Sequence, residues 1–136
     1  MATQIKGTNR EFLEILKALE AVKQAKGKSF AVLAARNIAA ITEHLRPIEE
    51  VALPKKAFVE LSEKVQRLIQ KEDQEAVTKL EQENEELIEE RKAQLLKVEE
   101  MLDEKASVKI NMIREEIVPE EVTAEQLLPL LKILKD

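Results

Sequence analysis

The sequence predicts an all-α fold, in which a long antiparallel helical hairpin of coiled-coil character is packed by an N-terminal helix. Composition is the first observation: 36% of the 136 residues are charged and 44% hydrophobic, with two Gly, four Pro and no Trp or Tyr. This profile is typical of long helices. Periodicity is the second, because apolar residues recur every three or four positions over most of the chain. The length, which suits a single domain with its own core, is the third.

The first predicted helix covers residues 8–26. Thr8 and Glu11 have the spacing of a capping box, in which each side chain accepts a hydrogen bond from the other residue's backbone N–H. Gly27 follows two lysines, and both features are typical of a helix C-terminus. Between these signals runs one apolar stripe: Phe12, Ile15, Leu16, Leu19 and Val22.

The second predicted helix covers residues 29–70, with Ser29 as its N-cap. Pro47 removes a backbone donor and is expected to kink the helix. Pro54 marks either a second break or the first turn of a new helix. The segment is therefore one long, bent helix or two stacked pieces.

The third predicted helix covers residues 72–105 and completes the hairpin. Its seam of a/d positions gives the candidate oligomer contacts Leu80, Asn84, Leu87, Arg91 and Val98. Polar residues at two of these positions cost stability and specify register or oligomeric state. The alternative contact face lies beside this seam and consists of Ile88, Leu95 and Leu102. Because such a seam leaves apolar edges, we expect a homo-oligomer, with a dimer as the first expectation.

The last third of the chain changes character. Residues 107–113 alternate apolar and polar side chains, which predicts a short strand. Residues 3–6 are its candidate partner in a small two-stranded element near the termini. A terminal helix is expected over residues 123–134, and it should be short, kinked or partly 3₁₀ because Pro129 lies inside it. All elements belong to a single helical domain, residues 1–136.

The sequence has few of the side chains that catalysis and cofactor binding usually need, so we expect a non-enzymatic protein without cofactors. The chain has no Cys and one His, His44, which excludes thiolate sites and multi-His metal sites. Four acidic residues resemble the carboxylates of a helical-bundle metal site: Glu85, Glu86, Glu89 and Glu90. Such sites also need His on the facing helices, and this chain has only one His.

Charge is unevenly distributed, although the net charge is only −5. Residues 1–71 carry 13 Lys or Arg and 8 Asp or Glu, whereas residues 72–136 carry 9 and 19. The basic half lacks interleaved aromatic residues, so nucleic-acid binding is disfavoured. A small anion is the remaining possibility, with Lys23, Lys26 and Lys28 as candidate contacts near the start of the second helix. Two adjoining helix caps are the simpler interpretation of this region.

The N-terminus lacks the apolar run of a signal peptide, and no apolar stretch is long enough to span a bilayer. We therefore expect a soluble, cytoplasmic protein without a membrane partner.

The order of these elements resembles a family of small phage-encoded helical-hairpin proteins of unknown function. Three stretches carry the resemblance: "SFAVLAARNIAAITEHL", "VKINMI" and "VTAEQLLPLLKIL". It implies a viral origin, a hairpin with a terminal strand and helix, and no catalytic residues. The leading functional hypothesis is binding and modulation of a host or viral protein. The alternatives are a scaffold or chaperone in virion assembly, and an oligomer that sequesters a small anionic ligand such as a nucleotide.

Overall fold

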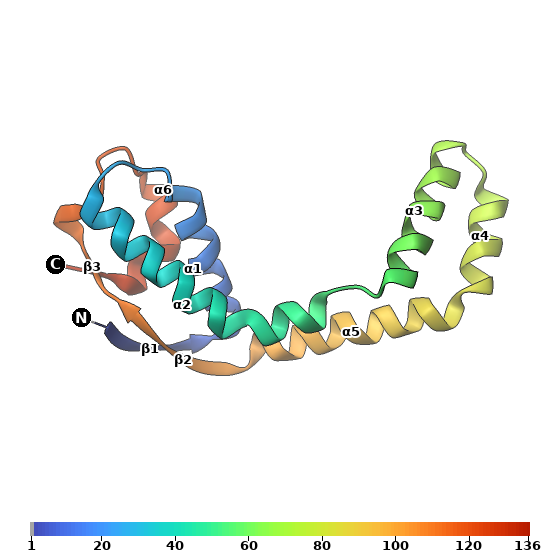
Figure 1. Ribbon diagram of the computed structural model, residues 1–136, viewed down its shortest axis with the longest axis horizontal. Helices are drawn as coiled ribbons and strands as arrows, with labels where there is room; N and C mark the ends of the chain where they lie inside the picture. The colour runs from blue at the N-terminus through green and yellow to red at the C-terminus, as the bar shows by residue number, and fades with distance from the viewer. Residues whose placement is uncertain (1) are drawn as a thin grey trace. The chain divides into compact units, whose positions relative to one another are not determined.

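The computed structural model describes residues 2–136, over which the chain forms six α-helices, four short β-strands and two 3₁₀ helices (Figure 1). The protein is thus mainly helical with a small two-stranded sheet, as predicted, and a second pair of two-residue strands was not expected. The chain divides into two compact units. Unit 1 combines the residues up to Pro47 with Met101–Asp136, and unit 2 is Ile48–Glu100.

The two-stranded sheet of unit 1 ties the N-terminal strand to a segment far along the chain. Strand β1 (Ala2–Thr8) pairs antiparallel with β2 (Lys105–Asn111), which confirms residues 3–6 as the partner of the alternating segment, although β2 covers 105–111 instead of 107–113. Two alternate residues of β2, Val108 and Ile110, are buried in the core. The period-two pattern in the sequence therefore marks the strand face that packs on the helices.

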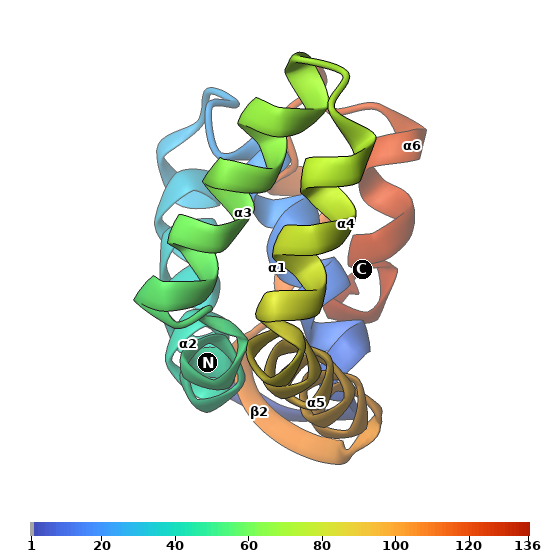
Figure 2. The ribbon, with the colours of Figure 1, turned by 90° about the vertical axis from the view of Figure 1, so that its right-hand side faces the viewer.

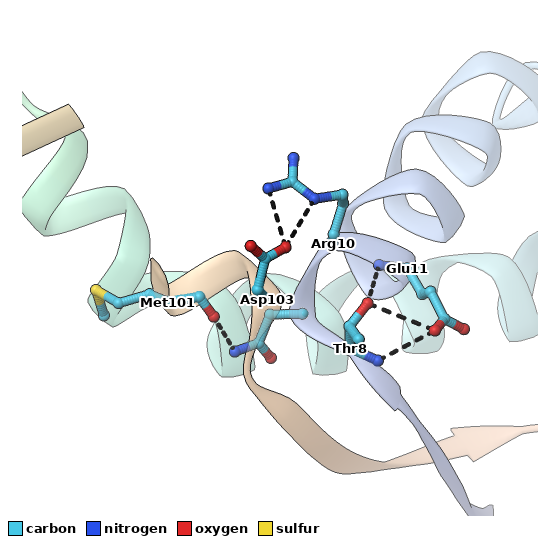
Figure 3. Close-up of polar contacts among 6 residues, drawn as sticks. Thr8, Arg10, Glu11, Met101 and Asp103 are labelled. Atoms are coloured by element: carbon cyan, nitrogen blue, oxygen red, sulfur yellow. Dashed lines mark hydrogen bonds and ion pairs between the residues drawn. The ribbon is translucent and has the colours of Figure 1, made fainter. Parts of the chain in front are cut away.

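Helix α1 (Asn9–Val22) begins at the predicted capping box but ends earlier than the predicted 26. Thr8 Oγ1 accepts the Glu11 N–H at 3.2 Å, and the Glu11 carboxylate accepts the Thr8 N–H (Figure 3). At the other end, the Ala25 N–H bonds the Val22 carbonyl and closes a turn. Gly27, with φ +133°, therefore does not end α1, and instead accepts the N–H of Ala31 at the start of the next helix.

The beginning of α1 is also fixed to the segment that leads into β2. The side-chain amide of Asn9, which is 8% exposed, donates to the Met101 carbonyl at 2.9 Å (Figure 3). The next residue, Arg10, bonds the Asp103 carboxylate through two guanidinium nitrogens, at 3.2 and 3.3 Å. These contacts set where β1 ends and α1 begins relative to β2.

Helix α2 (Lys28–Ala52) passes through Pro47 without interruption, whereas the chain breaks at Pro54. Helix α3 (Lys56–Gln70) follows. Of the two arrangements expected for residues 29–70, the structure has two helices. Proline disfavours helical backbone at the residue before it, so the break falls at Leu53.

The C-terminal segment completes the core of unit 1 through short elements. They are β3 (Ile113–Arg114), a 3₁₀ turn η1 (Glu115–Ile117), α6 (Ala124–Leu127), the 3₁₀ helix η2 (Leu128–Ile133) and β4 (Leu134–Lys135), which pairs parallel with β3. Residues 123–134 thus contain a four-residue α-helix and a six-residue 3₁₀ helix, which confirms the short, partly 3₁₀ element predicted from Pro129. The fully buried side chains around which unit 1 packs include Phe12, Leu19, Phe30, Ile41, Ile110, Ile113, Leu130 and Ile133.

Unit 2 contains α3 and α4 (Gln74–Glu83), which run side by side in opposite directions (Figure 2). The turn between them is a Schellman motif, in which the Asp73 N–H bonds the Leu68 carbonyl and the Glu72 N–H bonds the Ile69 carbonyl. Glu72 has φ +58°, the left-handed conformation usually taken by glycine at this position. Asp73 then caps α4 by accepting the Ala76 N–H.

One continuous helix over residues 72–105 is not what the structure shows. The helix breaks at Asn84, and α5 (Glu85–Asp103) continues in a new direction from α4 (Figure 1). Asn84 has a non-helical backbone (φ −119°, ψ 27°), and its side-chain amide donates to the Leu80 carbonyl at 2.9 Å. An asparagine side chain competes in this way for helical carbonyls and favours a helix end. The hairpin is therefore shorter than predicted and consists of α3 and α4.

Candidate protein-binding surface

The five predicted seam residues do not share one straight helix. Leu80 lies on α4, Asn84 at the break, and the other three on α5: Leu87, Arg91 and Val98. All five are half-buried. The bend at Asn84 separates the first part of the seam from the rest.

Arg91 has a role within its own unit. Its guanidinium donates to the carbonyl of Ala52, the last residue of α2, at 2.8 Å. It also lies over the ring of Phe58 in α3, with 5.7 Å from the guanidinium carbon to the ring centroid. A cation at a helix C-terminus satisfies a free carbonyl and complements the helix dipole. Arg91 therefore fixes the end of α2 to the start of α3 and to α5.

The large aliphatic side chains of unit 2 are mostly not enclosed by it. The buried apolar residues of unit 2 are Ile48, Leu61 and Val77. By contrast, five of its large aliphatic side chains are more than a third exposed: Leu53 (62%), Val59 (39%), Ile69 (50%), Leu95 (47%) and Leu96 (66%). Exposed aliphatic side chains of this size are candidate contacts for a protein partner.

Sequence reasoning included Leu95 in the alternative contact face but missed Leu96. A helix with one apolar stripe repeats its leucines every three or four residues, whereas adjacent leucines point about 100° apart, so a narrow core-facing stripe holds only one of them. The Leu95–Leu96 pair therefore signals that one of the two lies at the edge of the stripe, without saying which. In the structure both side chains are exposed, and Leu96 is the more exposed of the two.

The candidate anion contacts Lys23, Lys26 and Lys28 lie at the connection between α1 and α2, and all three are exposed. Lys23 Nζ forms an ion pair with Glu20 at 2.8 Å. The backbone N–H of Lys26 donates to the Glu121 carboxylate at 2.7 Å. Carboxylates of the chain itself thus occupy two of the groups that an anion would use.

The described residues do not bring titratable side chains together into an acid–base or metal site. His44 Nε2 lies 2.7 Å from the Asn9 Oδ1, and its ring packs edge-on against Phe12, so the half-buried imidazole has a structural role in unit 1. Over residues 2–136, no group of three or more His, Asp or Glu is arranged to hold a metal ion. The predicted cluster Glu85, Glu86, Glu89 and Glu90 is exposed.

One carboxylate is electrostatically distinctive. Glu11 accepts a hydrogen bond from Lys132 Nζ at 2.7 Å and a second one from the Thr8 N–H. The Lys132 ammonium is the main reason that the pKa of Glu11 lies below its usual value of 4.5. The same ammonium donates to the Lys6 carbonyl, so this exposed ion pair connects β1, α1 and η2.

No protein-family model, no curated protein and no solved structure matches the chain. Within residues 2–136, no helix combines the length and the apolar character needed to cross a membrane.

Proposed function

We propose that this chain is a non-enzymatic phage protein that binds and modulates a host or viral protein in the host cytoplasm. The observation that carries the proposal is the exposure of three aliphatic side chains at the α2–α3 connection and on α3, Leu53, Val59 and Ile69, in a unit with only three buried apolar side chains. A folded unit that leaves so many aliphatic side chains in water gains free energy when a partner covers them.

The binding surface that we assign to the partner comprises Leu53, Val59 and Ile69, at the α2–α3 connection and on α3. Its chemical surroundings suit an acidic partner. Lys56 lies three residues after Leu53 in the sequence, and Arg67 and Lys71 lie two residues before and after Ile69, whereas Lys55 pairs with Glu90 at 2.9 Å. Apolar side chains supply most of the affinity of an interface, and basic residues near them steer it toward negatively charged partners.

A binding role also agrees with the chemistry of the side chains. The single histidine is held by Asn9 and Phe12 inside unit 1, and the sequence has no thiol. A general base or a nucleophile would have to come from exposed carboxylates or hydroxyls, without the burial that tunes such groups for catalysis.

The test compares two double variants of the tagged full chain. Leu53→Ser with Ile69→Ser removes two apolar side chains of the surface, and Leu128→Ser with Leu131→Ser removes two leucines of similar exposure in unit 1. We expect the wild type and the second variant to retain the same protein from infected-cell lysate, and the first variant to lose it. The purified partner is then titrated against all three chains by calorimetry, where the first variant is expected to bind at least about tenfold more weakly.

Equal binding of the partner by all three chains would contradict the assigned surface. Recovery of the chain only with assembled particles would instead favour the assembly role. A nucleotide that raises the melting temperature would favour the sequestering role, because a ligand of the folded state stabilises it.

A further inference from the structure

The exposed face of α5 carries opposite charges at equal distances on either side of two exposed leucines. Lys92, Leu95, Leu96 and Glu99 are spaced as i, i+3, i+4 and i+7, which places them on one face of the helix. All four are exposed. The half-buried residues Leu87, Arg91, Gln94 and Val98 form a different face.

Lys92 and Glu99 lie at equal distances on either side of the midpoint between Leu95 and Leu96. A two-fold axis through this midpoint, perpendicular to the helix, therefore places Lys92 of one chain opposite Glu99 of another. The two leucines of each chain meet those of the other chain at the axis. A symmetric dimer needs a surface that is complementary to itself, and this face meets that condition in both charge and apolar contact.

We propose that α5 pairs in antiparallel order with α5 of a second copy of this chain, through Leu95 and Leu96 at the centre and Lys92–Glu99 ion pairs at both ends. A parallel pair would place Lys92 against Lys92 and Glu99 against Glu99, which is repulsive. The charges thus select the antiparallel orientation. The pairing uses none of the residues assigned above to the heterologous partner, so either proposal can fail without the other.

The contacts that these charges make within one chain do not prevent the pairing. Lys92 Nζ bonds the Glu89 carboxylate at 3.4 Å, and Glu99 also has a contact of its own. Lys92 and Glu99 both lie at the surface, where an ion pair contributes little to stability and can be exchanged for another. The free energy of association comes mainly from covering the two leucines, and the charges set orientation.

The first test measures the mass of the full chain by sedimentation equilibrium over a range of concentrations. We expect a reversible dimer for the wild type. Leu95→Glu with Leu96→Glu is expected to give a monomer with unchanged far-ultraviolet circular dichroism, since both side chains are already exposed. The matched control, Leu128→Glu with Leu131→Glu, changes leucines of similar exposure in unit 1 and is expected to leave the dimer intact.

The second test reverses the charges. Lys92→Glu alone and Glu99→Lys alone each create two like-charge contacts, and each is expected to raise the dissociation constant about tenfold. The double variant, Lys92→Glu with Glu99→Lys, restores both attractive pairs and is expected to restore the wild-type dissociation constant. In a parallel dimer neither single change would add repulsion, so single variants that dimerise like the wild type would overturn the proposed orientation.

The third test measures a distance directly. The chain has no cysteine, so Glu86→Cys offers one site for a spin label. From the axis position and a rise of 1.5 Å per residue, the two labels of an antiparallel dimer are separated by about 30 Å along the helices, against about 10 Å in a parallel one. A monomer at every concentration, a dimer unaffected by the changes at Leu95 and Leu96, or the short distance would each overturn the proposal.

Discussion

The side chain of Asn37 makes both of its hydrogen bonds with the backbone of one residue, Asn111. The Asn37 amide nitrogen donates to the Asn111 carbonyl at 2.9 Å, and the Asn37 amide oxygen accepts the Asn111 N–H at 2.8 Å. Asn37 lies in α2 with no exposed surface, while Asn111 ends β2. The buried side chain of Asn37 thus satisfies the two backbone groups of Asn111 that a neighbouring strand would otherwise bond.

Replacing Asn37 with Leu is expected to lower the free energy of unfolding by about 2–3 kcal/mol, because it leaves a donor and an acceptor of Asn111 without partners. The measurement is urea unfolding followed by circular dichroism. The neighbouring exposed Arg36→Ala serves as the control and is expected to stay within about 0.5 kcal/mol of the wild type. A Leu variant as stable as this control would show that the pair contributes nothing.

Arg91→Met is expected to destabilise the protein by about 1–2 kcal/mol, since the Ala52 carbonyl loses a charged donor and Phe58 loses its cation. Arg91→Lys keeps the charge but lacks the planar guanidinium, so we expect an intermediate loss. The exposed Lys97→Met controls for the removal of a positive charge from α5. Thermal unfolding of the three variants checks this order, and equal melting temperatures for all three would refute the capping role.

Glu72→Gly is expected to raise the free energy of unfolding by about 0.5–1 kcal/mol, because glycine adopts the left-handed conformation of this turn without steric cost. Lys71, the preceding residue, has an ordinary φ of −86°. Lys71→Gly therefore gains nothing in the folded state and is expected to destabilise. A melting temperature that falls in both variants would contradict the assignment.

The ion pair of Glu11 with Lys132 predicts a small dependence of stability on pH. The pKa of Glu11 is lower in the folded state than its usual value of 4.5, so its stabilising contribution is complete above that value. The contribution is lost as the pH falls through the lowered pKa. Thermal unfolding of the wild type and of Glu11→Gln over this acidic range measures it. We expect the difference in melting temperature between the two proteins to shrink as the pH falls, and a constant difference would count against the ion pair.

Features that depend on a few neighbouring residues could be predicted from the sequence. Thr8 and Glu11 carry the whole capping box between them, and the alternation of residues 107–113 marks the strand. The break at Asn84 was not predictable in the same way. Its position fits the seam of apolar residues, and no glycine or proline marks it.

The role of Arg91 depends on contacts that periodicity does not contain. The residue lies at a seam position, but its partner is the carbonyl of Ala52, which is free only because Pro54 ends α2. Similarly, Glu72 takes a conformation for which the sequence signal is normally a glycine. For the candidate surface, the sequence indicates which side chains are apolar, but only the packing shows that Leu96 is left outside.

The pairing of β1 with β2 has a consequence for the order of folding. Ala2 lies opposite Asn111, and all of unit 2 is encoded between the two strands. During translation β1 leaves the ribosome early, yet its partner strand emerges only after unit 2 has been synthesised. Because contacts between distant residues form slowly and carry a loop-closure cost, unit 1 is expected to complete its sheet last. Until then the unpaired edge of β1 is exposed, so the protein is expected to be most prone to aggregation while it is being synthesised.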